Sequence, residues 1–73
     1  MPVSKQNVDT IFSYHAPSPT HLISLQRVRE AAKTLAHVIL EETPQCADQQ
    51  AALRKLRESV MTANAAIVLD GDV

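Results

Sequence analysis

The sequence has few of the residues that cross-link very small folds. Its 73 residues include one cysteine, so an internal disulfide framework is excluded. Three histidines and this cysteine lack the paired spacings of a zinc site, and we expect neither a metal nor a cofactor. A chain of this length buries only about 60% of the surface that its unfolded form exposes. Its stability should therefore come partly from self-association.

Glycine, aromatic residues and long hydrophobic runs are also scarce. The chain has one glycine, one tyrosine, one phenylalanine and no tryptophan, yet 45% of its residues are hydrophobic. Such a composition favours helices over disorder. No stretch reaches the roughly 18 apolar residues of a membrane span. A net charge of −1 argues against a basic face for duplex DNA. We expect a cytoplasmic protein that binds neither membranes nor DNA, whereas a small anionic ligand is compatible with this charge.

The first quarter of the chain predicts a short helix followed by an elbow. Residues 5–13 carry three apolar side chains at helical spacing, and Ser4 can cap their N-terminus. The elbow covers residues 14–18, because Pro17 and Pro19 disfavour helical backbone at the residues before them. We expect the elbow to be ordered.

Two longer helices are predicted over residues 19–42 and 48–68. Ser18 and Pro19 match a helix start, and Pro44 ends the first helix, which leaves residues 43–47 as a turn. Each helix has an apolar seam with spacings of three and four residues. The seams are Leu25, Val28, Ala32, Leu35 and Ile39, then Leu53, Leu56, Val60, Ala63 and Ile67. The prediction is an all-α fold, with one antiparallel helical hairpin domain over residues 1–73.

Further apolar residues lie outside these seams. They are Leu22, Ala31, Ala36, Val38 and Leu40 in the first long helix, and Ala52, Met61, Ala65, Ala66 and Val68 in the second. A lone hairpin would expose them. Covering several of them is worth several kcal/mol at roughly 25 cal/mol per Å², which is comparable with the stability of a small domain. The sequence therefore predicts a homo-oligomer.

Arg29 and Lys33 lie four positions apart on the first long helix. Like charges at this spacing repel each other by about 0.2–0.5 kcal/mol. One interpretation is an anion site, in which the arginine holds a phosphate through two hydrogen bonds and the lysine adds a point charge. The alternative is that both side chains are solvated, with Glu30 pairing with Lys33. The spacing alone favours the solvated arrangement.

Tyr14 and Asn64 each allow two interpretations. The tyrosine ring in the elbow could stack on a nucleotide base, or it could close the core beneath the elbow, which the sequence alone favours. The asparagine lies among small apolar residues within a helix, where its amide needs a partner. That partner could be a second chain, which would fix the helix register, or a nucleotide base edge.

The remaining polar residues do not assemble into a catalytic site. His15 and His21 flank the elbow and His37 lies on the outer side of its helix, so surface or packing roles are expected for them. Cys46 is expected to be a free thiol in the turn. No nucleophile, base and orienting group occur together, and we expect no enzyme activity. The basic residues at 54, 55 and 57 are interpreted as part of a solvated helix face.

Three segments in order carry a family resemblance. They are F-S-Y-H-A-P at 12–17, R-E-A-A-K-T-L-A at 29–36 and V-M-T-A-N-A-A-I at 60–67. Together they resemble the small phage anti-CBASS sponge proteins, which sequester the cyclic oligonucleotide signals of bacterial antiviral defence. The sequence departs from that family's pattern at three positions. Ala16 stands where a second proline often follows the histidine, Ala32 replaces a common glycine, and Thr62 stands where a tryptophan is usual.

The resemblance implies a non-catalytic homohexamer of helical hairpins. Its members bind cyclic dinucleotides, cGAMP among them, in pockets between protomers, and some bind cyclic trinucleotides at separate sites. Matched to the family's segments, Tyr14 would stack on a base beside Pro17, and Arg29 and Lys33 would meet the phosphates. Asn64 would lie near the interface or the second site. The alternative function is a structural or adaptor hairpin that binds a protein through its apolar face.

Overall fold

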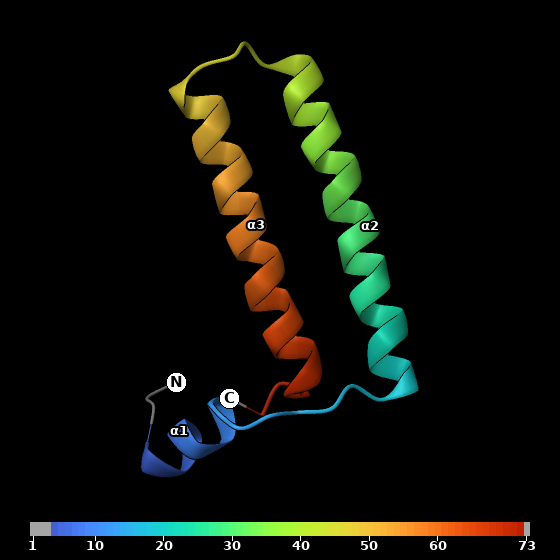
Figure 1. Ribbon diagram of the computed structural model, residues 1–73, viewed down its shortest axis with the longest axis vertical. Helices are drawn as coiled ribbons and strands as arrows, with labels where there is room; N and C mark the ends of the chain where they lie inside the picture. Colours follow the sequence, from blue (N-terminus) through green and yellow to red (C-terminus); the bar gives the residue numbers. More distant parts are fainter. Residues whose placement is uncertain (1–3, 73) are drawn as a thin grey trace.

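The computed structural model describes residues 4–72 and contains three α-helices (Figure 1). α1 spans Lys5–Ile11, α2 spans Pro19–Glu42 and α3 spans Ala47–Val68. α2 and α3 run antiparallel and pack side by side, while α1 lies beyond the open end of this hairpin. The all-α hairpin architecture expected from the sequence is confirmed.

Ser4 and Ser18 begin the first two helices through the same pair of hydrogen bonds. In α2, the Ser18 hydroxyl accepts from the backbone N–H of His21, and the Ser18 N–H donates to Nδ1 of His21, both at 3.1 Å. In α1, Asn7 makes the equivalent pair with Ser4. Each box satisfies N–H groups that a helix start leaves without partners. Because the Ser18 N–H can only donate, Nδ1 of His21 is the acceptor and the ring proton lies on Nε2.

Two predicted boundaries are wrong. α1 ends at Ile11 and not at residue 13, because Nε2 of His15 donates to the Thr10 carbonyl at 2.6 Å and turns the chain back on the helix end. α3 begins at Ala47 and not at residue 48, because the sulfur of Cys46 accepts from the Gln49 N–H at 3.5 Å and acts as the N-cap. The turn of the hairpin is therefore residues 43–46.

The seam of α3 follows the prediction, whereas the seam of α2 departs from it at one position. All five predicted seam residues of α3 are partly buried. In α2 Leu35 is 48% exposed, and Ala36 is partly buried in its place. A straight helix has 3.6 residues per turn and drifts relative to a 3.5-residue seam. On α2, Ala36 therefore takes the seam position that was predicted for Leu35.

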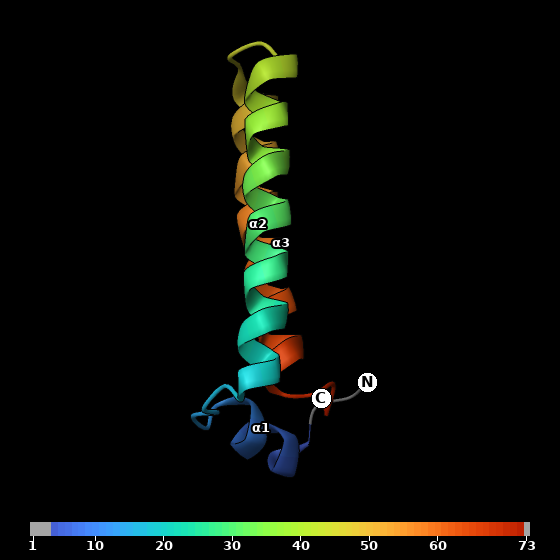
Figure 2. The same ribbon diagram turned by 90° about the vertical axis from the view of Figure 1, so that its right-hand side faces the viewer.

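The hairpin is one helix thick and does not enclose a core. Figure 2, turned by 90° from Figure 1, shows α2 and α3 nearly superimposed, and the molecule measures 45 × 28 × 17 Å. Among residues 4–72 no apolar side chain is buried. The chain exposes 5938 Å². A compact monomer of this size exposes about 4,400 Å². The excess, roughly 1,500 Å² on each chain, is about twice the 800 Å² that one partner buries in a standard protein interface.

Polar contacts close both ends of the hairpin. At the turn, Gln49 is 5% exposed, and its Nε2 donates to the carbonyl and to Oγ1 of Thr43, both at 3.1 Å. At the open end, Asp70 takes a left-handed backbone (φ 53°) just after α3, and its carboxylate accepts from Nε2 of His21 at 2.8 Å. The Asp70 and Gly71 N–H groups donate to the carbonyls of Ile67 and Ala66, which completes a Schellman-type helix end.

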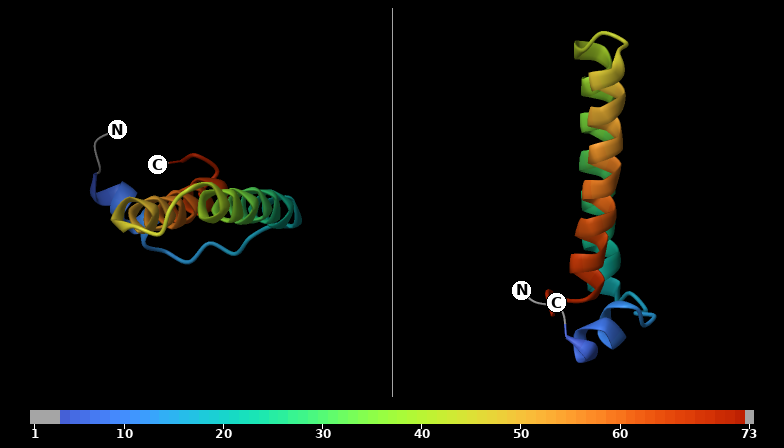
Figure 3. Two further views of the ribbon diagram at one scale, coloured as in Figure 1. Left: turned by 90° about the horizontal axis from the view of Figure 1, so that it is seen from above. Right: turned by 90° about the vertical axis from the view of Figure 1, so that its left-hand side faces the viewer.

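The elbow links α1 to α2 without packing α1 on the hairpin. Figure 3 shows residues 12–18 passing from beneath the end of α3 to the start of α2. Among the described helices, only α2 and α3 pack against each other. No helix within residues 4–72 has both the length and the apolarity needed to cross a membrane.

We predict that Gln49→Ala destabilises the hairpin by about 1–3 kcal/mol, because the Thr43 carbonyl loses its side-chain donor in a partly buried turn. Urea unfolding followed by circular dichroism measures this loss. Gln26→Ala is the matched control, since Gln26 is exposed within α2 and the same substitution there removes no buried contact. Equal effects of the two substitutions would contradict the role assigned to Gln49.

Candidate functional site

A groove of about 410 Å³ runs between α2 and α3 on one face of the hairpin. Its floor is apolar and its rim is basic. The lining residues are Arg29, Ala32, Lys33 and Ala36 from α2, and Leu53, Leu56, Arg57, Val60 and Met61 from α3. The floor residues are partly buried, while Met61 is 60% exposed at the edge. The groove therefore offers an apolar surface flanked by cations from both helices.

The cations of this groove make no ion pair with an acidic side chain of residues 4–72. Within residues 4–72 the only acid–base pair closer than 4.0 Å is His21–Asp70, so Glu30 does not pair with Lys33. No aspartate or glutamate of the described chain lines the groove. Arg29 and Lys33 are both exposed, as the solvated arrangement requires, but the expected Glu30–Lys33 ion pair is absent. Arg29 and Lys33 lie together at the groove with their charges uncompensated, as an anion site requires. Whether the two side chains bind an anion stays a prediction.

Arg57 is a groove residue that the sequence interpretation missed. Residues 54, 55 and 57 were expected to share a solvated helix face, but the structure places Arg57 on the rim opposite Arg29 and Lys33. The spacing of the apolar seam on α3 could have predicted the position of Arg57. Arg57 follows Leu53 by four positions and precedes Val60 by three, so it stands beside the seam on α3. A second hollow, lined by Gln50, Leu53, Arg54 and Arg57, continues the groove toward the turn.

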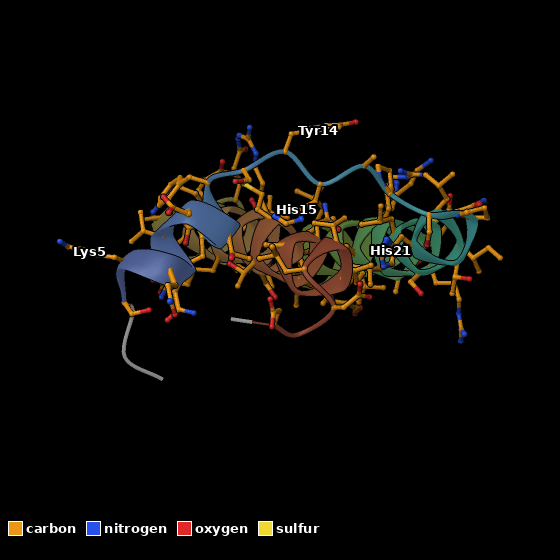
Figure 4. The ribbon with its side chains drawn as sticks, turned by 90° about the horizontal axis from the view of Figure 1, so that it is seen from below. Lys5, Tyr14, His15 and His21 are labelled. Carbon is orange, nitrogen blue, oxygen red and sulfur yellow. The ribbon has the colours of Figure 1, made fainter. Side chains whose placement is uncertain are left out.

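The elbow presents aromatic rings to solvent. Tyr14 is 88% exposed and Phe12 is 83% exposed. Figure 4 shows the Tyr14 side chain pointing away from the helices and His15 turned back toward them. The prediction that Tyr14 closes a core beneath the elbow is therefore wrong. The His15 hydrogen bond to Thr10 fixes the adjoining backbone, so the ring projects from an ordered segment.

A single chain does not bring the elbow and the groove together. Neither Tyr14 nor Pro17 lines the groove. Both lie at the open end of the hairpin, while Arg29 is ten residues into α2, about 15 Å along the helix axis from Pro19. Lys33 lies one further turn along α2. The predicted stacking residue and the predicted phosphate-binding residues thus occupy separate parts of each chain.

Asn64 is partly buried on α3, and its Oδ1 is buried without a hydrogen-bond partner within the described residues. It does not line the groove. An unpaired buried carbonyl of this kind costs about 1–3 kcal/mol. The structure thus confirms that this amide sits in an unfavourable setting within one chain. Whether a second chain or a ligand is its partner stays a prediction.

The opposite face of the hairpin holds a different hollow. It measures about 450 Å³ and is lined by Ser24, Arg27, Val28, Ala31 and Ile67. Because successive residues turn by 100°, positions 27 and 31 point away from positions 29 and 33 on α2. This hollow has one cation, whereas the groove has three. Residues 4–72 contain no group of three or more His, Cys, Asp or Glu side chains that could hold a metal ion.

Comparison with known protein families gives a match that covers most of the chain. The family model for the Acb2/Tad1 hairpin domain matches residues 4–68. The chain belongs to the Acb2/Tad1 hairpin family. No curated protein and no solved structure matches it. The matched range begins at the capping residue of α1 and ends with the last residue of α3, so it includes the elbow, the groove and Asn64.

Membership of the Acb2/Tad1 hairpin family gives the site its general role. This is a phage family of cyclic-nucleotide sponges that act against bacterial immune signalling, and membership implies the same role for this chain. The family binds cyclic oligonucleotides, and its members bind without catalysis. An uncompensated basic groove and an exposed aromatic ring are what such ligands require, because they carry phosphates and bases.

We predict that Asn64→Ala raises the stability of the unliganded hairpin by about 1 kcal/mol, because it removes an unpaired amide oxygen and introduces a better helix former. Thermal unfolding at low micromolar concentration checks this. Ser59→Ala is the control for helix propensity, since Ser59 is exposed in α3 and makes no side-chain hydrogen bond to a described residue. A loss of stability that deepens as the protein concentration rises would show instead that a second chain supplies the amide's partner.

Proposed function

We propose that this protein is a non-catalytic sponge that binds cyclic dinucleotides such as cGAMP. By mass action it lowers the free signal below the level that the host effector needs, and so blocks CBASS signalling. It would act in the cytoplasm of the infected bacterium. Cyclic trinucleotides are a second class of ligand that the same assembly would bind.

One observation carries this proposal: Arg29 and Lys33 line a groove that contains no carboxylate within the described chain. A phosphodiester supplies the negative charge that the groove lacks, and charge-assisted hydrogen bonds to arginine and lysine hold it. The apolar floor suits the sugar and base faces of a nucleotide. Because the packing of two helices shapes the groove, little ordering cost opposes binding.

A complete pocket on this proposal contains residues from two protomers. Tyr14 and Pro17 lie too far from Lys33 to reach the same small ligand within one chain, so the elbow of one protomer would cover the groove of the next. Asn64 would face the protomer interface or the trinucleotide site. The roughly 1,500 Å² of excess surface on each chain supports such contacts. We propose a homohexamer, in which assembly and ligand binding use the same surfaces.

We predict that Tyr14→Ala weakens cyclic dinucleotide binding by about 5- to 150-fold, which corresponds to about 1–3 kcal/mol of base stacking. Lys33→Gln should weaken it about tenfold or more, through loss of a charge-assisted hydrogen bond. Isothermal titration calorimetry with cGAMP measures both effects. Tyr14→Phe, which keeps the ring, and Lys55→Gln, which changes a lysine outside the groove, should bind as the unaltered protein does.

No heat from the unaltered protein with any cyclic dinucleotide would overturn the sponge proposal and favour the adaptor role. Binding that survives both Tyr14→Ala and Lys33→Gln would overturn the assigned site. The bound nucleotide should also be recovered chemically intact after denaturation, as mass spectrometry would show. Recovery of linear or hydrolysed product would indicate an enzyme.

Mixing the two weakened variants tests whether each pocket takes residues from two chains. We predict that Tyr14→Ala and Lys33→Gln chains, unfolded together in equal amounts and refolded, regain about one quarter of the unaltered pockets, because each pocket takes its two residues from different subunits. Calorimetry gives the number of restored sites, and light scattering gives the assembly size. If both residues acted within one chain, no site would be restored.

A further inference from the structure

The groove between α2 and α3 carries more positive charge than Arg29 and Lys33 of α2 supply. Arg57 reaches it from α3, on the rim facing Arg29 and Lys33. Arg54 joins Arg57 along the adjoining hollow, so four of the seven Lys and Arg residues of the chain line one continuous strip. None of the eight Asp and Glu residues that the described chain includes lines that strip.

This clustering runs against the charge of the chain as a whole, which is −1. Arg29 and Lys33 are like charges four positions apart, and Arg54 and Arg57 are like charges three positions apart, so both pairs oppose helix formation. Glu58 lies four positions after Arg54 on the same helix face, but no ion pair within 4.0 Å joins it to a described residue. An anion bound between the helices would relieve the repulsion.

We propose that Arg57 is a third phosphate-binding residue, so that one ligand bridges α2 and α3. This inference rests on the proposed function and adds a contact to it. A cyclic dinucleotide presents two phosphates on opposite sides of its ring, and the groove presents cations on opposite rims. Arg29 and Lys33 hold one phosphate from α2. The guanidinium of Arg57 holds the other from α3, with the fork geometry that suits two phosphate oxygens.

Arg57→Gln tests this contact, because it keeps a polar side chain of similar reach and removes the charge. We expect affinity for cGAMP to fall about tenfold or more. We expect the slope of log Kd against log salt concentration to become shallower, because one of the attractions that salt screens is lost. Arg27→Gln is the matched control, since Arg27 is exposed on the opposite face and the substitution changes the net charge equally. It should leave affinity within about twofold and the slope unchanged.

A ligand-side measurement separates direct contact from a structural effect. In two cGAMP analogues, one or the other phosphate is replaced by an uncharged methylphosphonate. With one of them, Arg57→Gln should have less than about a twofold effect, because the charge that Arg57 contacts is already gone. Arg57→Lys should restore the salt dependence while recovering only part of the affinity, since lysine keeps the charge without the fork.

If the unaltered protein binds cGAMP and Arg57→Gln behaves as Arg27→Gln does, the assignment of Arg57 is overturned and the sponge function stands. Equal effects of Arg57→Gln on both analogues and on cGAMP itself would also overturn it, because they would indicate altered folding or assembly. If the unaltered protein binds no cyclic dinucleotide, the proposed function fails and the assignment of Arg57 fails with it.

Discussion

Two helices packed side by side share one line of contact, and every other side chain they carry faces solvent or another molecule. This constraint governs the rest of the structure. The α2–α3 seam leaves its apolar residues only partly buried, and α1 adds no packing to it within the described chain. Polar contacts at the ends therefore matter more than in a larger domain: Gln49 closes the turn, and His21 joins the start of α2 to the residue after α3. Its exposed area is larger than that of a compact monomer of its length, which supports the proposed association.

The same geometry separates the two faces of the hairpin and allows them different chemistry. On one face the basic rims of the groove belong to different helices, so the packing of α2 on α3 sets the spacing of the charges across it. On the other face a single arginine stands beside small and apolar residues. The proposed sponge would use this division, with one surface attracting phosphates and others meeting neighbouring protomers. The charge lies on a face of the hairpin and not in a loop, so it is held by rigid elements.

The helices were predictable because their signals are local. Ser18-Pro19 and Thr43-Pro44 are neighbours in sequence, and they bound α2 at Pro19 and Glu42. The spacing also identified Arg29 and Lys33 as a pair of like charges on α2. What failed depended on contacts between distant residues or on unusual caps: the His15 bond that shortens α1, the sulfur cap of Cys46, and the shift of the seam from Leu35 to Ala36. Arg57 was missed because its proximity to Lys33 exists only after the helices pack. Tyr14 was misjudged because the sequence could not show that the chain has no core for it to close.

The exposure of Tyr14 has a consequence for how such a protein changes over generations. Its ring adds almost nothing to the stability of the single chain, whereas residues of the seam or the turn are tied to the fold. Substitutions at position 14 therefore alter what the elbow contacts at little cost in folding free energy. On the proposed function, a phage protein confronted with a host that changes the bases of its signal would explore new stacking partners there. The scaffold that assembles the pockets is left intact.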